Sequence, residues 1–131
     1  MKKYKFTGET KEEYGVKFRR IEAVIDFGDV NKGDIGGWIE GEENLSQNGN
    51  AWVSDDARVY GDALVSGDAQ VSGDAQVSGN ALVSGNAQVS GDSLVSGDAQ
   101  VSGDAWVYGD ALVSGHARVY GDALVSGHAR V

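Results

Sequence analysis

A strict six-residue glycine period is the strongest constraint in this sequence. Glycine recurs at every sixth position from Gly61 to Gly127 without one failure. The residues around it read Ala-x-Val-Ser/Tyr-Gly-Asp/Asn/His, and thirteen complete copies run from Val53 to Arg130. A unit this short cannot bury a core alone, so we expect consecutive copies to stack into a solenoid.

Each copy predicts one short strand and one corner. The first four residues alternate apolar, variable, apolar and polar, which is the period of a strand with Ala63 and Val65 inward and Leu64 and Ser66 outward. Gly67-Asp68 would form the corner, since Gly adopts positive φ freely and Asp tolerates it better than most residues. Proline is absent from the chain, as expected where neighbouring coils need almost every backbone N–H.

An aliphatic residue followed four positions later by a small one resembles the hexapeptide-repeat proteins. This resemblance implies an all-β fold, a single-chain left-handed parallel β-helix with three six-residue sides per coil. We predict that residues 36–131 form this β-helix. Residues 1–35 would form an N-terminal β-hairpin-like cap that covers the open strand edges of the first coil.

The first fifty residues differ in composition from the repeats. Residues 3–7 and 16–25 predict two strands around a turn at 12–15. Leu45 and Val53 are eight apart instead of six, which we interpret as a two-residue insertion at the first corner. The segments 26–30, 33–40 and 44–47 resemble the corresponding region of phage- and prophage-encoded hexapeptide proteins that carry acyltransferase names, which implies a phage or prophage origin.

Large apolar residues gather at outward positions in the last third of the chain. With three sides per coil, Leu94 would stack on Leu112 and Trp106 on Leu124. Aromatic enrichment is typical of binding hot spots, whereas ordinary cross-strand packing is the alternative explanation. The predicted partner-binding residues are Trp106, Tyr108, Leu112, Tyr120 and Leu124.

Acidic residues would form columns at the three corners. Neighbouring coils lie about 4.8 Å apart, so stacked carboxylates repel one another, and Asn in two of the columns would relieve this repulsion. Turn chemistry, a bound cation, and an acidic surface that meets a basic partner or mimics nucleic acid are three explanations. The columns are Asp56, Asp74, Asp92, Asp110 and His128; Asp62, Asn80, Asp98 and His116; Asp68, Asn86, Asp104 and Asp122.

Evidence for catalysis is weak. The resemblance implies a catalytic histidine near a loop that leaves the helix, with an acyl-CoA or nucleotide-linked acyl donor between subunits. The histidines, His116 and His128, occupy corner positions, and no loop interrupts residues 53–131. We therefore predict no catalytic, cofactor-binding or metal-binding residues and lean against an enzyme; if the chain is one, it is an acyltransferase.

Composition and charge narrow the function further. The chain has no Cys, no long apolar run and no signal peptide, so we expect it in the cytoplasm of a bacterial host, without membrane contact. Its net charge is −9, and the repeats contain three Arg and no Lys, which argues against direct nucleic-acid binding.

These observations favour a non-enzymatic structural or protein-interaction module of unknown partner, which self-associates or binds that partner through its sides or its C-terminal end. The chain stops at Val131 without a closing element, so we expect homo-oligomers through this uncapped end, unless a longer protein has been truncated. An acidic inhibitor that mimics nucleic acid and a reduced hexapeptide acyltransferase are the alternatives.

Overall fold

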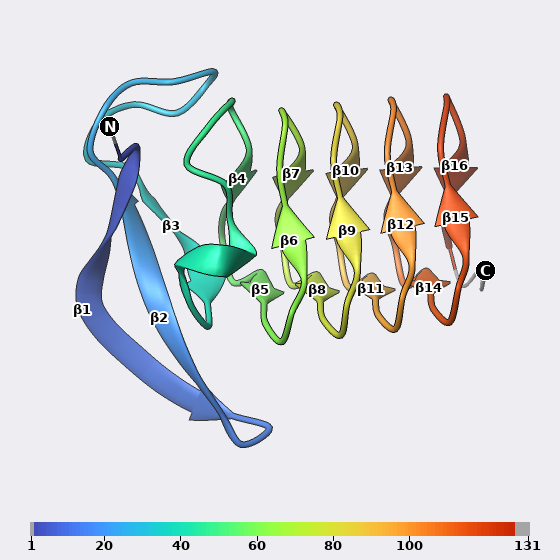
Figure 1. The fold of residues 1–131 in the computed structure, drawn as a ribbon, viewed down its shortest axis with the longest axis horizontal. Helices are drawn as coiled ribbons and strands as arrows, with labels where there is room; N and C mark the ends of the chain where they lie inside the picture. Colours follow the sequence, from blue (N-terminus) through green and yellow to red (C-terminus); the bar gives the residue numbers. More distant parts are fainter. Residues whose placement is uncertain (1, 128–131) are drawn as a thin grey trace.

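The protein is an all-β parallel solenoid of about five coils, seen in a computed structural model that describes residues 2–127 (Figure 1). The coils lie side by side along the long axis, and a β-hairpin lies at the N-terminal end. Within the described residues the helical structure is one 3₁₀ turn, η1 (Glu42–Asn44). No helix in this part of the chain has the length and apolar character needed to span a membrane. The all-β solenoid prediction is confirmed, whereas the left-handed crossover stays a prediction.

Three sheets form the three sides of the coil. Paired residues are eighteen positions apart, as Val71 is from Val89 and Val89 from Val107, which confirms three six-residue sides. Side 1 contains β4 (Trp52–Val53), β7 (Gln70–Val71), β10 (Gln88–Val89), β13 (Trp106–Val107) and β16 (Leu124–Val125). Side 2 contains β5 (Arg58–Val59), β8 (Gln76–Val77), β11 (Leu94–Val95) and β14 (Leu112–Val113). Side 3 contains β6 (Leu64–Val65), β9 (Leu82–Val83), β12 (Gln100–Val101) and β15 (Arg118–Val119).

The strands are two residues long, so the prediction of four-residue strands is wrong. The rest of each copy forms a turn: in Ser72–Ala75, the Ala75 N–H donates to the Ser72 carbonyl at 3.3 Å. Gly73 has φ +66°, and among residues 2–127 no Asp, Asn or His that follows a repeat glycine has positive φ. Positive φ at the first central position alone is the pattern of a type II′ turn. In these turns the glycine alone therefore has positive φ, and the Asp, Asn or His that follows it does not.

The core is the stack of inward alanines and valines. Every strand valine from Val53 to Val113 is fully buried, which confirms the predicted inward positions. Ser93, which replaces an alanine, is also buried, and its hydroxyl donates to the Ser90 carbonyl at 2.6 Å. This hydrogen bond satisfies the one polar side chain that the repeat places in the core.

The first coil carries the predicted insertion. Leu45 forms a parallel bridge with Val65, twenty positions on, whereas Val53 pairs with Val71, eighteen positions on. The strand β3 (Ile35–Ile39) is also in the longer register, with Ile39 opposite Val59. Two extra residues therefore lie between Leu45 and Val53, as the spacing predicts.

A β-hairpin precedes the solenoid and pairs with its first strand. It consists of β1 (Tyr4–Glu13) and β2 (Val16–Ala23), joined by Tyr14 and Gly15, which have φ +55° and +73°, as in a type I′ turn. The strand β1 continues beyond Thr7, where we expected it to end, through a register shift between Phe6 and Thr10. The strand β2 pairs antiparallel with β3 and so covers that edge of the first coil. The boundary at residue 35 stays a prediction.

Side chains from this region take the place of a preceding coil. The Lys3 ammonium donates to the Ala51 carbonyl at 2.7 Å, and the Asn44 amide donates to the Ala63 carbonyl at 2.8 Å and to the Gly61 carbonyl at 3.1 Å. Burial lowers the pKa of Lys3 to about 8, although the negative charge of Asp68 opposes this shift. These bonds satisfy carbonyl groups that a further coil would otherwise pair.

The hairpin tip lies against side 2. Arg58 donates to Glu13 at 2.6 Å, and this hydrogen bond holds the pKa of the Glu13 carboxyl below its usual value. The ring of Tyr14 stacks on that of Tyr60 with centroids 6.2 Å apart, and the Tyr14 hydroxyl accepts a hydrogen bond from Gln76 at 3.1 Å. The hairpin therefore occupies the outer surface of side 2 beside the first coils.

Candidate functional site

Side 1 differs from the other two sides because its outward residues are all uncharged. Side 2 carries Arg58 and side 3 carries Arg118, whereas side 1 presents only amide, hydroxyl, aromatic and aliphatic groups. We call this surface the Trp106 face; its outward residues are Trp52, Ser54, Gln70, Ser72, Gln88, Ser90, Trp106, Tyr108, Leu124 and Ser126.

Two columns of exposed acidic residues border the Trp106 face. Each column follows the corner at one edge of side 1, and adjacent members lie about one strand spacing, roughly 4.8 Å, apart. One edge holds Asp56, Asp74, Asp92 and Asp110; the other holds Asp68, Asn86, Asp104 and Asp122. The face is therefore a neutral strip between two rows of carboxylates.

Asparagine separates carboxylates where it enters a column. Two unit charges about 4 Å apart repel by about 1 kcal/mol in water. The Asn86 amide instead donates to Asp104 at 3.1 Å, and in the third column the Asn80 amide donates to Asp98 at 3.0 Å. The amides replace a repulsion with a hydrogen bond, as we expected.

The structure brings three of the five predicted binding residues together. Trp106 pairs in register with Leu124, and the rings of Trp106 and Tyr108 meet edge to face with centroids 6.3 Å apart. Leu112 lies on side 2, and Tyr120 follows β15 on side 3. The exposed fractions of Trp106 and Leu124 are 47% and 64%, so this end of the Trp106 face offers apolar surface to solvent.

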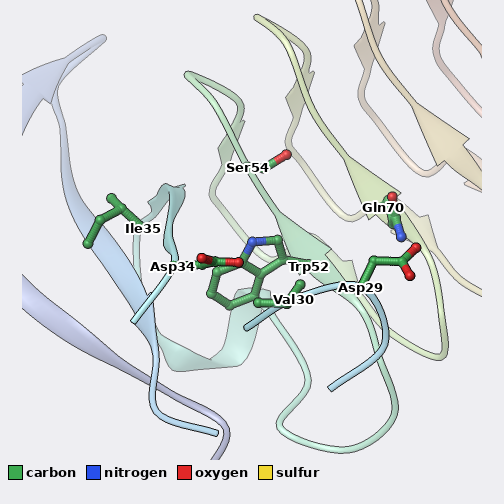
Figure 2. A pocket seen from close by; sticks show the side chains of 7 residues that line it. All are labelled: Asp29, Val30, Asp34, Ile35, Trp52, Ser54 and Gln70. Atoms are coloured by element: carbon green, nitrogen blue, oxygen red, sulfur yellow. The ribbon is translucent and has the colours of Figure 1, made fainter. Parts of the chain in front are cut away.

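A hollow of about 320 Å³ lies at the opposite end of the same face (Figure 2). Strands β4 and β7 supply its floor, and the loop between β2 and β3 supplies its wall. In Figure 2 the indole of Trp52 lies between Asp34 on one side and Asp29 on the other. The lining residues are Asp29, Val30, Asp34, Ile35, Trp52, Ser54 and Gln70.

Short-range hydrogen bonds fix the loop that carries both carboxylates. Phe27 and Val30 exchange backbone hydrogen bonds of 2.8 and 2.9 Å around the turn that contains Asp29. The Asp34 carboxylate accepts from the Asn31 N–H at 2.9 Å, and Phe27 packs edge to face on Trp52 with centroids 5.3 Å apart. The backbone turn that carries Asp29 and the carboxylate of Asp34 are therefore held in place before any ligand arrives.

The histidines do not form a catalytic arrangement in the described residues. His116 is exposed at a corner, where its Nδ1 lies 3.3 Å from the Asp98 carboxylate. His128 lies outside the described residues. Another shallow hollow, of about 330 Å³, is lined by Gln100, Ser102, Arg118 and Tyr120 and does not include His116. Among residues 2–127 no three His, Asp or Glu side chains are placed to hold a metal ion together.

The sequence reasoning missed Asp29 and Asp34 as site residues. It assigned them to the cap because they precede the repeats and lack a periodic pattern. A usable signal was present: two Gly-Asp pairs, Gly28-Asp29 and Gly33-Asp34, occur within seven residues and are separated by three. Such pairs mark turns, but nothing in the sequence indicates that these turns face Trp52.

A family model described as the YdcK beta solenoid repeat matches the chain in overlapping stretches. They cover residues 51–67, 57–73, 75–91, 87–103, 99–115, 111–127 and 117–131, which is more than half of the chain. The chain belongs to this family. The match agrees with the hexapeptide-repeat resemblance, because each coil of this solenoid contains three six-residue copies.

A curated relative adds a name without an established activity. The "Uncharacterized acetyltransferase YdcK" of Escherichia coli (strain K12) is 39% identical over 67 residues, which cover 45% of this chain and 21% of the relative. The aligned part is thus about a fifth of that relative's length. The similarity relates part of the chain to part of a protein that has an acetyltransferase name.

Proposed function

We propose that the chain is a β-solenoid interaction module that binds a basic protein surface along the Trp106 face. The observation that carries this proposal is the neutral strip between two exposed carboxylate columns. A partner with an apolar or polar centre and basic residues on both sides would match this charge pattern. The exposed pair Trp106 and Leu124 would supply the apolar contact at one end of the face.

A second copy of the chain fits this face less well than a basic partner. Two Trp106 faces brought together would oppose acidic columns to acidic columns, which disfavours the complex by like-charge repulsion. Homo-association by other surfaces stays a prediction, and the solution mass at two protein concentrations measures it. The phage or prophage origin and the cytoplasmic location also stay predictions.

The geometry supports binding more than acyl transfer. From residue 53 to residue 127 the strands follow one another at intervals of six residues and no longer loop leaves the coil, so no loop in that range encloses a substrate. His116 is exposed on a corner and lines neither hollow. A basic partner could include a nucleic-acid-binding protein, for which the carboxylate columns would imitate a phosphate backbone.

The test is protein capture with matched charge variants. Asp92→Asn/Asp104→Asn removes two charges beside the Trp106 face, and Asp62→Asn/Asp98→Asn removes two from the corner between sides 2 and 3. Each pair includes one carboxylate that accepts from an asparagine. The immobilised chains are exposed to bacterial lysate at about 50 and about 500 mM salt, because charge-driven binding weakens with ionic strength.

We expect basic proteins to be retained at low salt by the wild type and by Asp62→Asn/Asp98→Asn, but not by Asp92→Asn/Asp104→Asn. Mass spectrometry identifies them. If the two variants retain the same proteins, or if the amount retained is the same at both salt concentrations, the proposal is wrong.

Acyl transfer is the second candidate, favoured by the acetyltransferase name of the relative. Calorimetric titration with acetyl-CoA tests it, with His116→Ala as the variant. Binding that His116→Ala abolishes would favour the enzyme; no heat of binding is the result that we expect.

A further inference from the structure

We propose that the hollow at the N-terminal end of the Trp106 face receives one basic side chain, arginine or lysine, of a bound peptide or protein. The inference rests on the proposed function, since a basic partner lying along the face would reach this hollow. Trp52, Ser54 and Gln70 belong both to the face and to the lining of the hollow.

The size of the hollow suits a single side chain. Ligand pockets commonly have volumes of roughly 300 to 1,000 Å³, and this hollow, at about 320 Å³, lies at the lower limit. It is small for a nucleotide-linked acyl donor, but a guanidinium or ammonium group with its methylene chain fits such a space.

The charges of the lining select a cation. Asp29 and Asp34 contribute two carboxylates, and no Lys, Arg or His lines the hollow. Ionised carboxylates only accept hydrogen bonds, whereas guanidinium and ammonium groups only donate them. Val30 and the half-exposed Ile35 add apolar surface beside the carboxylates, where the methylene groups of a long basic side chain can pack.

Trp52 provides an independent indication of a ligand. Only 6% of the surface of Trp52 is exposed, yet its indole N–H donates to no acceptor in the described residues. Trp52 lines the hollow, and in Figure 2 its indole nitrogen lies on the edge of the ring toward Ser54, another residue of the lining. A peptide carbonyl beside the basic side chain would accept this hydrogen bond.

The site is also prepared for binding. The backbone exchange between Phe27 and Val30, the bond from Asn31 to Asp34 and the packing of Phe27 on Trp52 hold the wall in position. A preformed site avoids the entropy cost of ordering a loop on binding.

The test uses short capped peptides that contain one arginine, or citrulline as its uncharged analogue. The readout is the ¹⁵N–¹H resonance of the indole groups, of which the chain has three, assigned by Trp→Phe variants. The variants are Asp29→Asn and Asp34→Asn. Asp26→Asn is the control, because Asp26 lies in the same loop but binds the Lys32 N–H and does not line the hollow.

We expect the arginine peptide to move the Trp52 resonance and leave those of Trp38 and Trp106 in place. The citrulline peptide, Asp29→Asn and Asp34→Asn should each weaken binding by about tenfold, the loss of one charge-assisted hydrogen bond, and Asp26→Asn should not. Equal shifts with both peptides, or no shift at Trp52, would overturn the inference.

The same experiment separates this inference from the proposed function. Suppose that a longer arginine-rich peptide needs Asp92 and Asp104 for binding but does not shift the Trp52 resonance. The proposed binding face would then stand, and the proposed binding in the hollow would be refuted. In the converse outcome, a short peptide shifts the Trp52 resonance, but the binding of the longer peptide does not depend on Asp92 and Asp104. Binding in the hollow would then stand, and the proposed binding face would be refuted.

Discussion

The first coil and the middle coils satisfy their backbone carbonyl groups in different ways. In the middle, the N–H of one coil reaches the carbonyl of the next, as Gln70 does to Ala87 at 2.9 Å. At the start, β3 still pairs in this way, but side chains take the role at other positions: the Lys3 ammonium donates to the Ala51 carbonyl, and the Asn44 amide donates to the Ala63 carbonyl. The repeats therefore continue by backbone pairing that many sequences could make, whereas the start depends on particular side chains.

The largest expected effect is steric and concerns a glycine of the middle coils. A Cβ on Gly85 would lie 2.9 Å from the Gly103 nitrogen at a φ of +65°. We expect Gly85→Ala to lower the free energy of unfolding by about 3 kcal/mol, from left-handed strain and overpacking together. Chemical denaturation measures this loss.

The hairpin supplies the matched control for that glycine. Gly8 also has positive φ, +101°, but a Cβ there would meet nothing within 4 Å. Gly8→Ala should therefore cost only about 1 kcal/mol, the strain alone. Equal losses at Gly8 and Gly85 would contradict the close approach of neighbouring coils.

The next effect tests the substitute donors of the first coil. Asn44→Ala removes the amide that serves the Gly61 and Ala63 carbonyls, and should cost about 2 kcal/mol because buried acceptors lose their donor. Asn86→Ala removes an exposed bond to Asp104 and should change stability by less than about 0.5 kcal/mol. A loss at Asn86 as large as at Asn44 would remove the distinction between the two regions.

Lys3 gives the start of the solenoid a pH dependence. Its folded pKa of about 8 is below its value of 10.5 in the unfolded chain, so between these pH values the unfolded chain binds more protons. Stability should then rise with pH, by up to about 2 kcal/mol between pH 8 and pH 10. Above pH 10 the raised pKa of buried Tyr4 acts in the opposite direction, because the unfolded chain loses that proton first.

The measurement for Lys3 is denaturation of the wild type and of Lys3→Met across this pH range. Lys3→Met is expected to be less stable at every pH, so the quantity to compare is the change in the free energy of unfolding with pH. The same upward slope in both proteins would mean that Lys3 is not the titrating group.

The smallest effect on stability is expected on the Trp106 face. Trp106→Ser and Tyr120→Ser each remove an exposed aromatic ring, on sides 1 and 3 respectively, and should change the free energy of unfolding by less than about 0.5 kcal/mol. Only Trp106→Ser should reduce retention of a basic partner in the capture experiment. Equal reductions would show that general exposed aromatic surface, and not this face, binds the partner.

The repeat region could be predicted closely from the sequence. The period of six, together with the three sides per coil that the hexapeptide resemblance implies, placed Val71, Val89 and Val107 on one side. The eight-residue step from Leu45 to Val53 located the insertion. A strict period fixes which residues meet, because every copy repeats the same contacts. It did not fix strand length, since the Ser-to-Ala turn takes up residues that the alternation pattern assigned to strands.

The start of the solenoid could be predicted only in outline. A hairpin was expected, but the extension of β1 to Glu13 depends on the irregular pairing around Gly8. The burial of Lys3 and the hollow beside Trp52 arise from contacts between the first repeats and residues far before them in the sequence, in a region without a period. Such contacts leave no pattern in a single sequence.

The most direct test of the proposed binding face is the affinity of a labelled arginine-rich peptide, measured by fluorescence anisotropy with the two charge variants. Both variants have the same net charge. Asp92→Asn/Asp104→Asn should weaken binding by about tenfold, the sum of two exposed charge contacts, and Asp62→Asn/Asp98→Asn by no more than about twofold. The same loss in both variants would mean that overall charge attracts the peptide and that the Trp106 face is not the binding site.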